Sequence, residues 1–197
     1  MATTSAALGQ GESSEKVTLA SGSKRKKTTK AKKPLPRVKL PPNPFQSEIL
    51  DLVHKTRGRA KKIELLQEYR NDALVSLMIW NFDDTVQSAL PDGEVPYKRN
   101  DAPAGTEHTS LRQEQRHFFN FIQGGNDSLS KTRRETIFIQ ILETLLPEEA
   151  EILCLVKDQR LVAKYPTLSQ ELIAEAYEDI QWGGRGGTKY EVGVVER

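Results

Sequence analysis

The chain has 197 residues, of which 37% are hydrophobic and 28% are charged, a balance typical of one globular domain with additional polar sequence. No run approaches the roughly 20 apolar residues of a membrane-spanning helix, and the N-terminus lacks a basic region followed by an apolar block, so we expect neither membrane contact nor a secretory signal. The net charge of +2 is the sum of two oppositely charged parts.

Residues 1–44 form the basic part of the chain. They hold ten Lys and Arg against Glu12 and Glu15, a net charge of +8, whereas residues 45–197 hold 19 basic and 25 acidic residues, a net charge of −6. The run KRKKTTKAKK repels itself, and PLPRVKLPPNP contains five prolines. Such sequence buries too little apolar surface to offset the entropy of ordering, so residues 1–44 are predicted to be a disordered Lys/Pro-rich tail.

From Phe45 onward, apolar residues recur at the spacing of amphipathic helices, beginning with Ile49, Leu52 and Val53. This pattern predicts an all-α domain over residues 45–182, a compact bundle of six or seven short helices. One of these helices is expected over residues 110–122. A Gly-rich flexible segment over residues 183–197 is expected to follow. The residues expected to start helices are Asn71, Ser110 with Gln113, Ser130, Pro147, and Thr167 with Gln170.

The longest irregular stretch of the domain is PDGEVPYKRNDAPAGTEHT at residues 91–109, whose three prolines and two glycines exclude a regular helix. A loop of this length in a compact domain is more often functional, or ordered by its own packing, than accidental. We therefore expect it to contact a protein partner, together with the GGRGG segment at 183–187. The candidate partner-binding residues are Tyr97, Lys98, Arg99, Glu107, His108 and Arg185.

Patterns that would indicate catalysis or metal binding are weak. The segment GGRGGTK at 183–189 lacks the lysine-before-hydroxyl order of a phosphate-binding loop. Glu114 and His117 have the Glu-x-x-His spacing of di-iron bundles, which need that motif twice. Cys154, the only cysteine, lies in the apolar run EILCLV and is expected to be a buried, unreactive thiol. We expect no enzyme, no metal and no cofactor, and we interpret the acidic pairs Asp83-Asp84, Glu148-Glu149 and Glu178-Asp179 as helix caps and solvated surface.

The basic tail favours an anionic partner. Its lysines can neutralise phosphates and release counterions, which gives salt-sensitive nucleic-acid binding without sequence specificity. An acidic protein surface and mere solubility remain alternatives, and the choice between DNA and RNA stays open. The candidate nucleic-acid-binding residues are Lys24, Arg25, Lys26, Lys27, Lys30, Lys32, Lys33, Arg37 and Lys39.

Several longer motifs carry a resemblance. They are WNFDD at 80–84, PDGEVPY at 91–97, NDAPAGTEHTSL at 100–111, FIQGGND at 121–127, RETIFIQILE at 134–143, PEEAEILCLVKD at 147–158 and WGGRGG at 182–187. Over residues 46–187 the chain resembles an uncharacterised protein family of T4-like tailed bacteriophages, including those of marine cyanobacteria. The resemblance implies a protein made in the cytoplasm of an infected bacterium and carries over no catalytic residue.

The leading functional hypothesis is a non-enzymatic phage accessory protein. Its helical domain would dock a phage or host protein, while its tail contacts DNA or RNA. The first alternative is a structural or scaffold component of the virion. The second is a small metal-dependent enzyme that uses Glu107, His108, Glu114 and His117.

Overall fold

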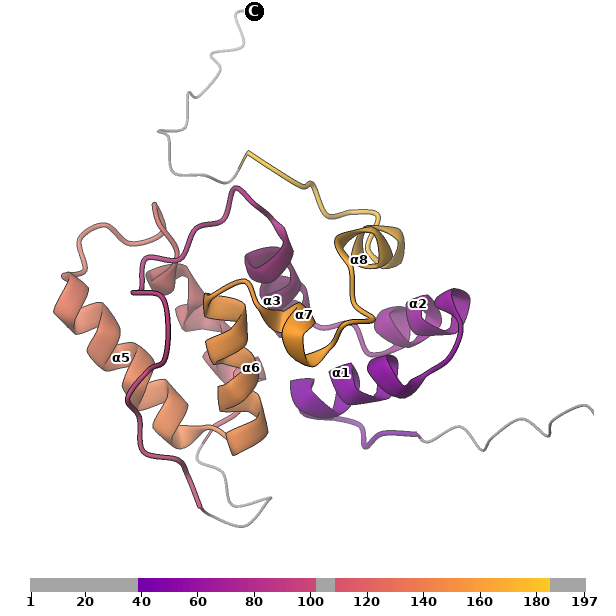
Figure 1. Ribbon diagram of the computed structural model, residues 1–197, viewed down its shortest axis with the longest axis horizontal. Helices are drawn as coiled ribbons and strands as arrows, with labels where there is room; N and C mark the ends of the chain where they lie inside the picture. Colours follow the sequence, from indigo (N-terminus) through magenta and orange to yellow (C-terminus); the bar gives the residue numbers. More distant parts are fainter. Residues whose placement is uncertain (1–38, 102–108, 185–197) are drawn as a thin grey trace, which may run out of the picture. The chain divides into compact units, whose positions relative to one another are not determined.

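A computed structural model describes residues 39–101 and 109–184 (Figure 1). Over these residues the chain forms eight α-helices, one 3₁₀ helix and no strand, apart from an isolated antiparallel bridge between Ser88 and Ile122. The all-α prediction is therefore confirmed. The elements are α1 (Gln46–Lys55), α2 (Arg59–Glu68), α3 (Asp72–Phe82), α4 (Leu111–Glu114), the 3₁₀ helix η1 (Gln115–Phe121), α5 (Lys131–Thr144), α6 (Pro147–Lys157), α7 (Leu161–Lys164) and α8 (Gln170–Ala176).

The helix count exceeds the predicted six or seven for two reasons. The segment expected as one helix over 110–122 divides into α4 and η1, and α7 is an additional single turn. In a 3₁₀ helix, residues three apart project to the same side. Phe118 and Phe121 of η1 therefore both reach Trp80 of α3, with ring centroids 5.8 and 6.3 Å away.

Three of the predicted helix starts are confirmed. The Asn71 side chain accepts a hydrogen bond from the Leu74 N–H at 2.9 Å and caps α3. The Ser130 hydroxyl accepts one from the Arg133 N–H at 3.4 Å and caps α5. Pro147 occupies the first turn of α6, where its missing N–H costs nothing.

The two predicted capping boxes do not form. Ser110 precedes α4 but makes no side-chain capping bond, and Gln113 does not return one. The helix expected after Thr167 begins two residues later, because the Ser169 hydroxyl accepts the hydrogen bond from the Leu172 N–H at 3.3 Å. Thr167 and Ser169 can each cap a helix here, and the prediction of Thr167 was wrong because Ser169 is the cap of α8.

Helix α3 forms the centre of the fold, with α5 and α6 on one side and α1, α2 and α8 on the other (Figure 1). It contacts α4, α6 and η1, while α2 packs between α1 and α8. The largest fully buried side chains come from nearly every element, so one continuous core joins both sides. They include Trp80, Tyr165, Tyr177, Phe121, Phe138, Ile49, Leu50, Leu66, Leu74, Leu77 and Met78.

The packed body extends beyond the predicted boundaries of 45 and 182. Leu40 packs against the core, and its N–H donates a hydrogen bond to the Tyr69 hydroxyl at 3.2 Å. At the other end Trp182 packs on the core, and the Gly183 N–H lies 3.0 Å from the Asp83 carboxylate. The predicted tail up to residue 38 and the C-terminal segment from 185 lie outside the described residues.

Candidate functional site

Residues on the buried face of α6 hold the helix starts and the loop that form the candidate functional surface. The buried residues of this helix recur three or four positions apart, from Glu149 through Ile152, Leu153 and Val156 to Lys157. The buried stripe therefore begins with a carboxylate and ends with an ammonium group. Each charge lies at the end of the helix where the macrodipole favours it.

Glu149 is completely buried and holds two other helices at their starts. One carboxylate oxygen accepts a hydrogen bond from the Gln46 N–H of α1 at 2.8 Å, and the other accepts one from the Leu111 N–H of α4 at 2.9 Å. The N-termini of α1, α4 and α6 thus converge on one carboxylate. The pair Glu148-Glu149 was interpreted as helix caps and solvated surface. Glu149 does cap helix starts, but it is buried, whereas Glu148 is exposed as expected.

Asp83 is the C-cap of α3, in keeping with its interpretation as a helix cap, but it is not solvated. It is buried, and its carboxylate accepts hydrogen bonds from the N–H and hydroxyl of Thr85 and from the Gly183 N–H. This contact joins the WNFDD motif to the beginning of the WGGRGG motif. The neighbouring Asp84 and the pair at 178–179 are exposed, as expected.

Lys157, at the other end of the α6 stripe, fixes the loop that follows α3. We call residues 86–101 the strap. The buried Lys157 ammonium donates hydrogen bonds to the carbonyl oxygens of Pro91 at 2.8 Å and Gly93 at 3.0 Å, and it pairs with Asp158. The strap is therefore hydrogen-bonded to the C-terminal end of α6 through the Lys157 ammonium group, which is almost entirely shielded from water.

Further contacts hold the strap along α5 and α6 (Figure 1). The Gln159 side-chain amide donates a hydrogen bond to the Val86 carbonyl at 2.9 Å. Lower down, the Lys98 N–H donates one to the Glu143 carboxylate of α5 at 3.1 Å. The strap lacks regular secondary structure, yet its backbone is anchored at its beginning, middle and end.

The structure separates the predicted partner-binding residues into three groups. Tyr97 is half-buried against the core, and burial raises the pKa of its hydroxyl, so its ring is an anchor of the strap. Lys98 and Arg99 are exposed next to it, as expected for contact residues. Glu107, His108 and Arg185 lie outside the described residues.

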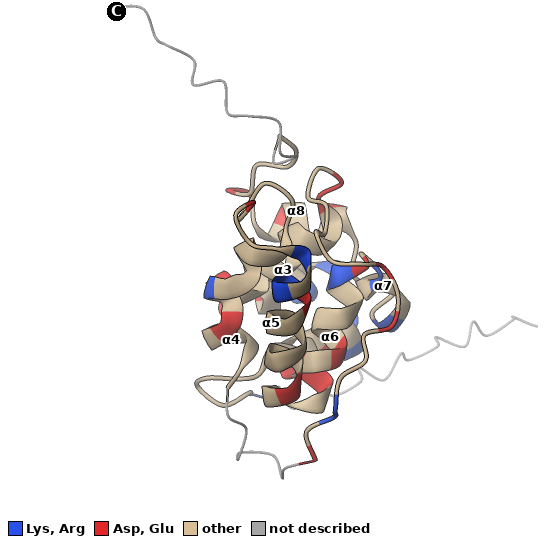
Figure 2. Ribbon diagram, turned by 90° about the vertical axis from the view of Figure 1, so that its left-hand side faces the viewer, with Lys and Arg blue, Asp and Glu red and all other residues tan. Residues whose placement is uncertain are grey.

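Both signs of charge are interspersed on the face that carries α4, α5, α6 and the strap (Figure 2). The exposed strap residues alone include Glu94, Lys98, Arg99 and Asp101. Their chemistry favours hydrogen bonds and ion pairs with a polar protein surface.

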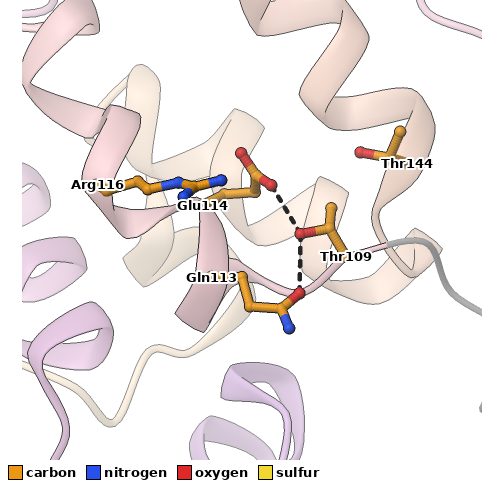
Figure 3. Close-up of a pocket in the computed structure, with 5 residues that line it drawn as sticks. All are labelled: Thr109, Gln113, Glu114, Arg116 and Thr144. Atoms are coloured by element: carbon orange, nitrogen blue, oxygen red, sulfur yellow. Dashed lines mark hydrogen bonds between the residues drawn. The ribbon is translucent and has the colours of Figure 1, made fainter.

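The described residues line a cavity next to the strap and a separate open pocket. The narrow cavity, of about 110 Å³, lies beneath the strap and is lined by strap, α5 and α6 residues that include Pro96, Phe138 and Lys157. An open pocket of about 600 Å³ lies at the start of α4 (Figure 3). The lining residues of this second pocket are Thr109, Gln113, Glu114, Arg116 and Thr144.

The open pocket presents a carboxylate, a guanidinium group, an amide and two hydroxyls. The Thr109 hydroxyl lies 2.7 Å from the Glu114 carboxylate and 3.1 Å from the Gln113 side-chain oxygen, while Thr144 faces them from α5 (Figure 3). These groups can bind a polar ligand or a partner side chain. They do not provide a nucleophile with a base oriented by a third group.

The Glu-x-x-His pair is close but isolated. His117 Nε2 lies 3.9 Å from the Glu114 carboxylate. Among the residues with described positions, no three His, Cys, Asp or Glu side chains gather closely enough to hold a metal ion. In the same residues, no helix has the length and apolar character needed to cross a membrane.

The environment of Cys154 supports the expectation that its thiol reacts slowly. Cys154 is partly buried on α6, and burial raises the pKa of its thiol to about 11 from the ordinary value of 9.0. At pH 8 its thiolate fraction is therefore about 100-fold lower than that of an ordinary cysteine. We expect labelling by a thiol reagent to be slower than labelling of the urea-unfolded chain by about this factor. Equal rates would contradict the burial of Cys154.

Of the predicted nucleic-acid-binding residues in the tail, the described part of the chain includes only the last, Lys39. Lys39 is exposed, while Lys24 and the other predicted nucleic-acid-binding residues up to Arg37 lie outside the described part of the chain. Their role stays a prediction.

Sequence reasoning missed Glu149 and Lys157 because both residue types are usually exposed. A signal was nevertheless present. Both residues lie in register with Ile152, Leu153 and Val156, so extending the helical period in either direction places them on the buried face.

Comparison with known proteins gives a match within the helical body and not in the tail. A model of a protein family matches residues 49–163, from α1 to α7. No curated protein and no solved structure shows detectable similarity to the chain. Because the match covers more than half of its length, the protein belongs to a family of unknown function, DUF6433.

Proposed function

We propose that this protein is a non-enzymatic interaction protein. Its helical body docks a protein partner through the strap, and its N-terminal tail contacts DNA or RNA without sequence specificity. The observation that carries the proposal is the strap itself, an irregular segment whose backbone is hydrogen-bonded to the side chains of Gln159, Lys157 and Glu143. Its exposed side chains are thereby presented to a partner.

The anchoring of the strap supports a docking role. Binding through an unordered loop loses conformational entropy at the moment of association, and a pre-organised loop avoids much of that cost. The hydrogen bonds from Lys157 and to Glu143 fix the backbone on both sides of Val95 and Tyr97. Lys98 follows directly and remains exposed.

The charge of the tail supports the nucleic-acid part of the proposal. Residues 1–44 carry a net charge of +8 and the rest of the chain −6. Each lysine or arginine that replaces a counterion on a phosphate contributes to a salt-dependent affinity. An acidic body is repelled by the same phosphates, which leaves its surface available for a protein.

The resemblance to proteins of T4-like phages extends this proposal to a setting. The protein would act in the cytoplasm of an infected bacterium, between a phage or host protein and nucleic acid. A virion component with the same tail would instead contact packaged genome. Mass spectrometry of purified particles separates the two, because an accessory protein is absent from them and a structural one is abundant.

Affinity purification of the tagged full chain from infected cells, with and without nuclease, tests both halves of the proposal. We expect one protein to co-purify in both cases and to be lost from a Lys98→Glu/Arg99→Glu variant. A matched Lys131→Glu/Arg133→Glu variant, altered at exposed residues of α5, should retain it. A partner that disappears with nuclease treatment, or equally from both variants, would contradict docking through the strap.

A further inference from the structure

The narrow cavity beneath the strap is lined mainly by hydrocarbon side chains. The strap and α5 supply them, so two motifs that are far apart in the sequence, PDGEVPY and RETIFIQILE, meet there. The apolar lining residues are Leu90, Pro91, Val95, Pro96, Phe138 and Ile139. An apolar cavity of roughly 150 Å³ takes up benzene. At about 110 Å³, the cavity beneath the strap suits a group the size of a leucine side chain.

The lining of this cavity passes from buried to exposed residues. Phe138 and Lys157 are buried, whereas Glu135 is partly buried. Glu94 and Pro96 of the strap are exposed. The cavity therefore reaches the surface, with an inner end at Phe138 and Lys157 and an outer end at the two carboxylates.

The inner end favours an uncharged group. The Lys157 ammonium has three donors. Two of them go to the carbonyl oxygens of Pro91 and Gly93, and the third goes to the Asp158 carboxylate. Because all three are used, an anionic ligand gains no hydrogen bond there, and a second ammonium group is repelled. A hydrocarbon side chain meets neither obstacle, and it supplies dispersion contacts to the lining of the cavity.

The outer end favours a cation. Within residues 39–101 and 109–184, neither the Glu94 carboxylate nor the Glu135 carboxylate makes an ion pair or a hydrogen bond. Two such carboxylates next to an apolar cavity attract a lysine or arginine side chain and repel a phosphate group. Their charge therefore favours a protein over a nucleic acid as the occupant.

We infer that this cavity binds a leucine-sized aliphatic side chain of the protein partner, next to which the partner carries a lysine or arginine. The aliphatic group fills the space between the strap and α5, and the basic group pairs with Glu94 and Glu135. This inference rests on the proposed docking through the strap and adds the chemistry that the partner presents.

The cavity is continuous with the proposed docking residues. Lys98 and Arg99 follow Pro96 of the cavity lining by two and three positions. The exposed charge of the strap thus changes from negative at Glu94 to positive at Lys98. One partner segment that is basic beside its aliphatic residue and acidic farther along complements both.

The test uses a five-residue acetylated and amidated peptide with leucine at its centre, lysine on both sides of it and serine at each end. The peptide is titrated into the isotope-labelled full chain, and the methyl signals of Leu90, Val95 and Ile139 are followed by NMR. We expect these signals to shift. The same peptide with alanine at its centre should bind at least about ten-fold more weakly, because it lacks most of the buried hydrocarbon. A peptide with glutamate in place of both lysines should leave the signals unchanged at the same concentration.

A pair of variants of the protein tests the outer end. Glu94→Gln/Glu135→Gln keeps the size of the lining but removes its charge, and it should weaken binding of the leucine peptide about five-fold. The matched control is Glu68→Gln/Glu178→Gln, which removes two exposed carboxylates from α2 and from the segment after α8. It should change the affinity less than two-fold. Equal affinities for the leucine and alanine peptides, no shifts of the three methyl signals, or equal losses in both double variants would overturn the inference.

The partner recovered by affinity purification separates this inference from the proposed function. A partner that is lost from Lys98→Glu/Arg99→Glu, but binds Glu94→Gln/Glu135→Gln as tightly as the unaltered chain, would uphold docking through the strap and overturn the role of the cavity. Leucine-peptide binding at the cavity, without any partner that depends on Lys98 and Arg99, would uphold the cavity as a binding site and refute the proposed role of those two residues.

Discussion

Replacing Glu149 with alanine is expected to lower the free energy of unfolding by about 3–5 kcal/mol. The substitution leaves the N–H groups of Gln46 and Leu111 buried without an acceptor and removes the negative charge shared by three helix starts. Both bonds have a charged acceptor and are therefore stronger than ordinary backbone bonds. Urea denaturation followed by circular dichroism measures the loss.

Two further variants make this prediction specific. Glu148→Ala removes an exposed carboxylate from the same helical turn and should cost about 0.5 kcal/mol. Glu149→Gln retains one oxygen acceptor but turns an amide NH₂ group toward a backbone donor, so an intermediate loss is expected. A Glu149→Ala variant as stable as Glu148→Ala would refute the role of Glu149 in holding α1 and α4.

Replacing Lys157 with methionine is expected to release the strap and to lower stability by about 2–4 kcal/mol. Methionine fills the space of the lysine stem but cannot donate to the carbonyl oxygens of Pro91 and Gly93. It also leaves Asp158 without its charged partner. Amide hydrogen exchange should accelerate most over residues 93–98, ahead of the rest of the body.

A matched control is Lys164→Met, because Lys164 also pairs with a carboxylate, that of Glu151, but at the surface. Surface pairs contribute about 0–1 kcal/mol, so this variant should leave exchange in the strap unchanged. If amide exchange in Lys157→Met accelerates equally throughout the body, Lys157 stabilises the whole fold and does not fix the strap in particular.

These two residues connect stability to the proposed function. Glu149 fixes the positions of α1 and α4, and α4 carries two residues of the open pocket, Gln113 and Glu114. Lys157 fixes the strap beside the same group of helices. If the strap docks a partner as proposed, it depends on buried polar groups, because an irregular segment is not stable alone.

The fold class and several helix starts were predictable because they depend on local sequence. Asn71, Ser130 and Pro147 act on the backbone within three residues of themselves, and apolar periodicity marks the buried faces directly. The change from α4 to η1 was not predictable in this way. Its aromatic residues Phe118 and Phe121 pack against Trp80, which lies far away in the sequence.

The candidate site was predictable only in part. Residue type alone identified Lys98 and Arg99 as exposed loop residues. Tyr97 was predicted to contact a partner, but it packs against the core. The polar sequence around it contains no pattern that indicates this packing. The pairing of Asp83 with Gly183 joins positions 100 residues apart, and no local rule relates them.

The salt dependence of DNA binding tests most directly the proposed division between a basic tail and a partner-binding body. In one full-length variant, every Lys and Arg from Lys24 to Arg37 becomes glutamine, and in a matched one every Lys in that range becomes arginine. We expect the glutamine variant to lose most of the slope of log Kd against log salt, while the arginine variant keeps the slope of the unaltered chain. An unchanged slope in the glutamine variant would contradict the proposed division.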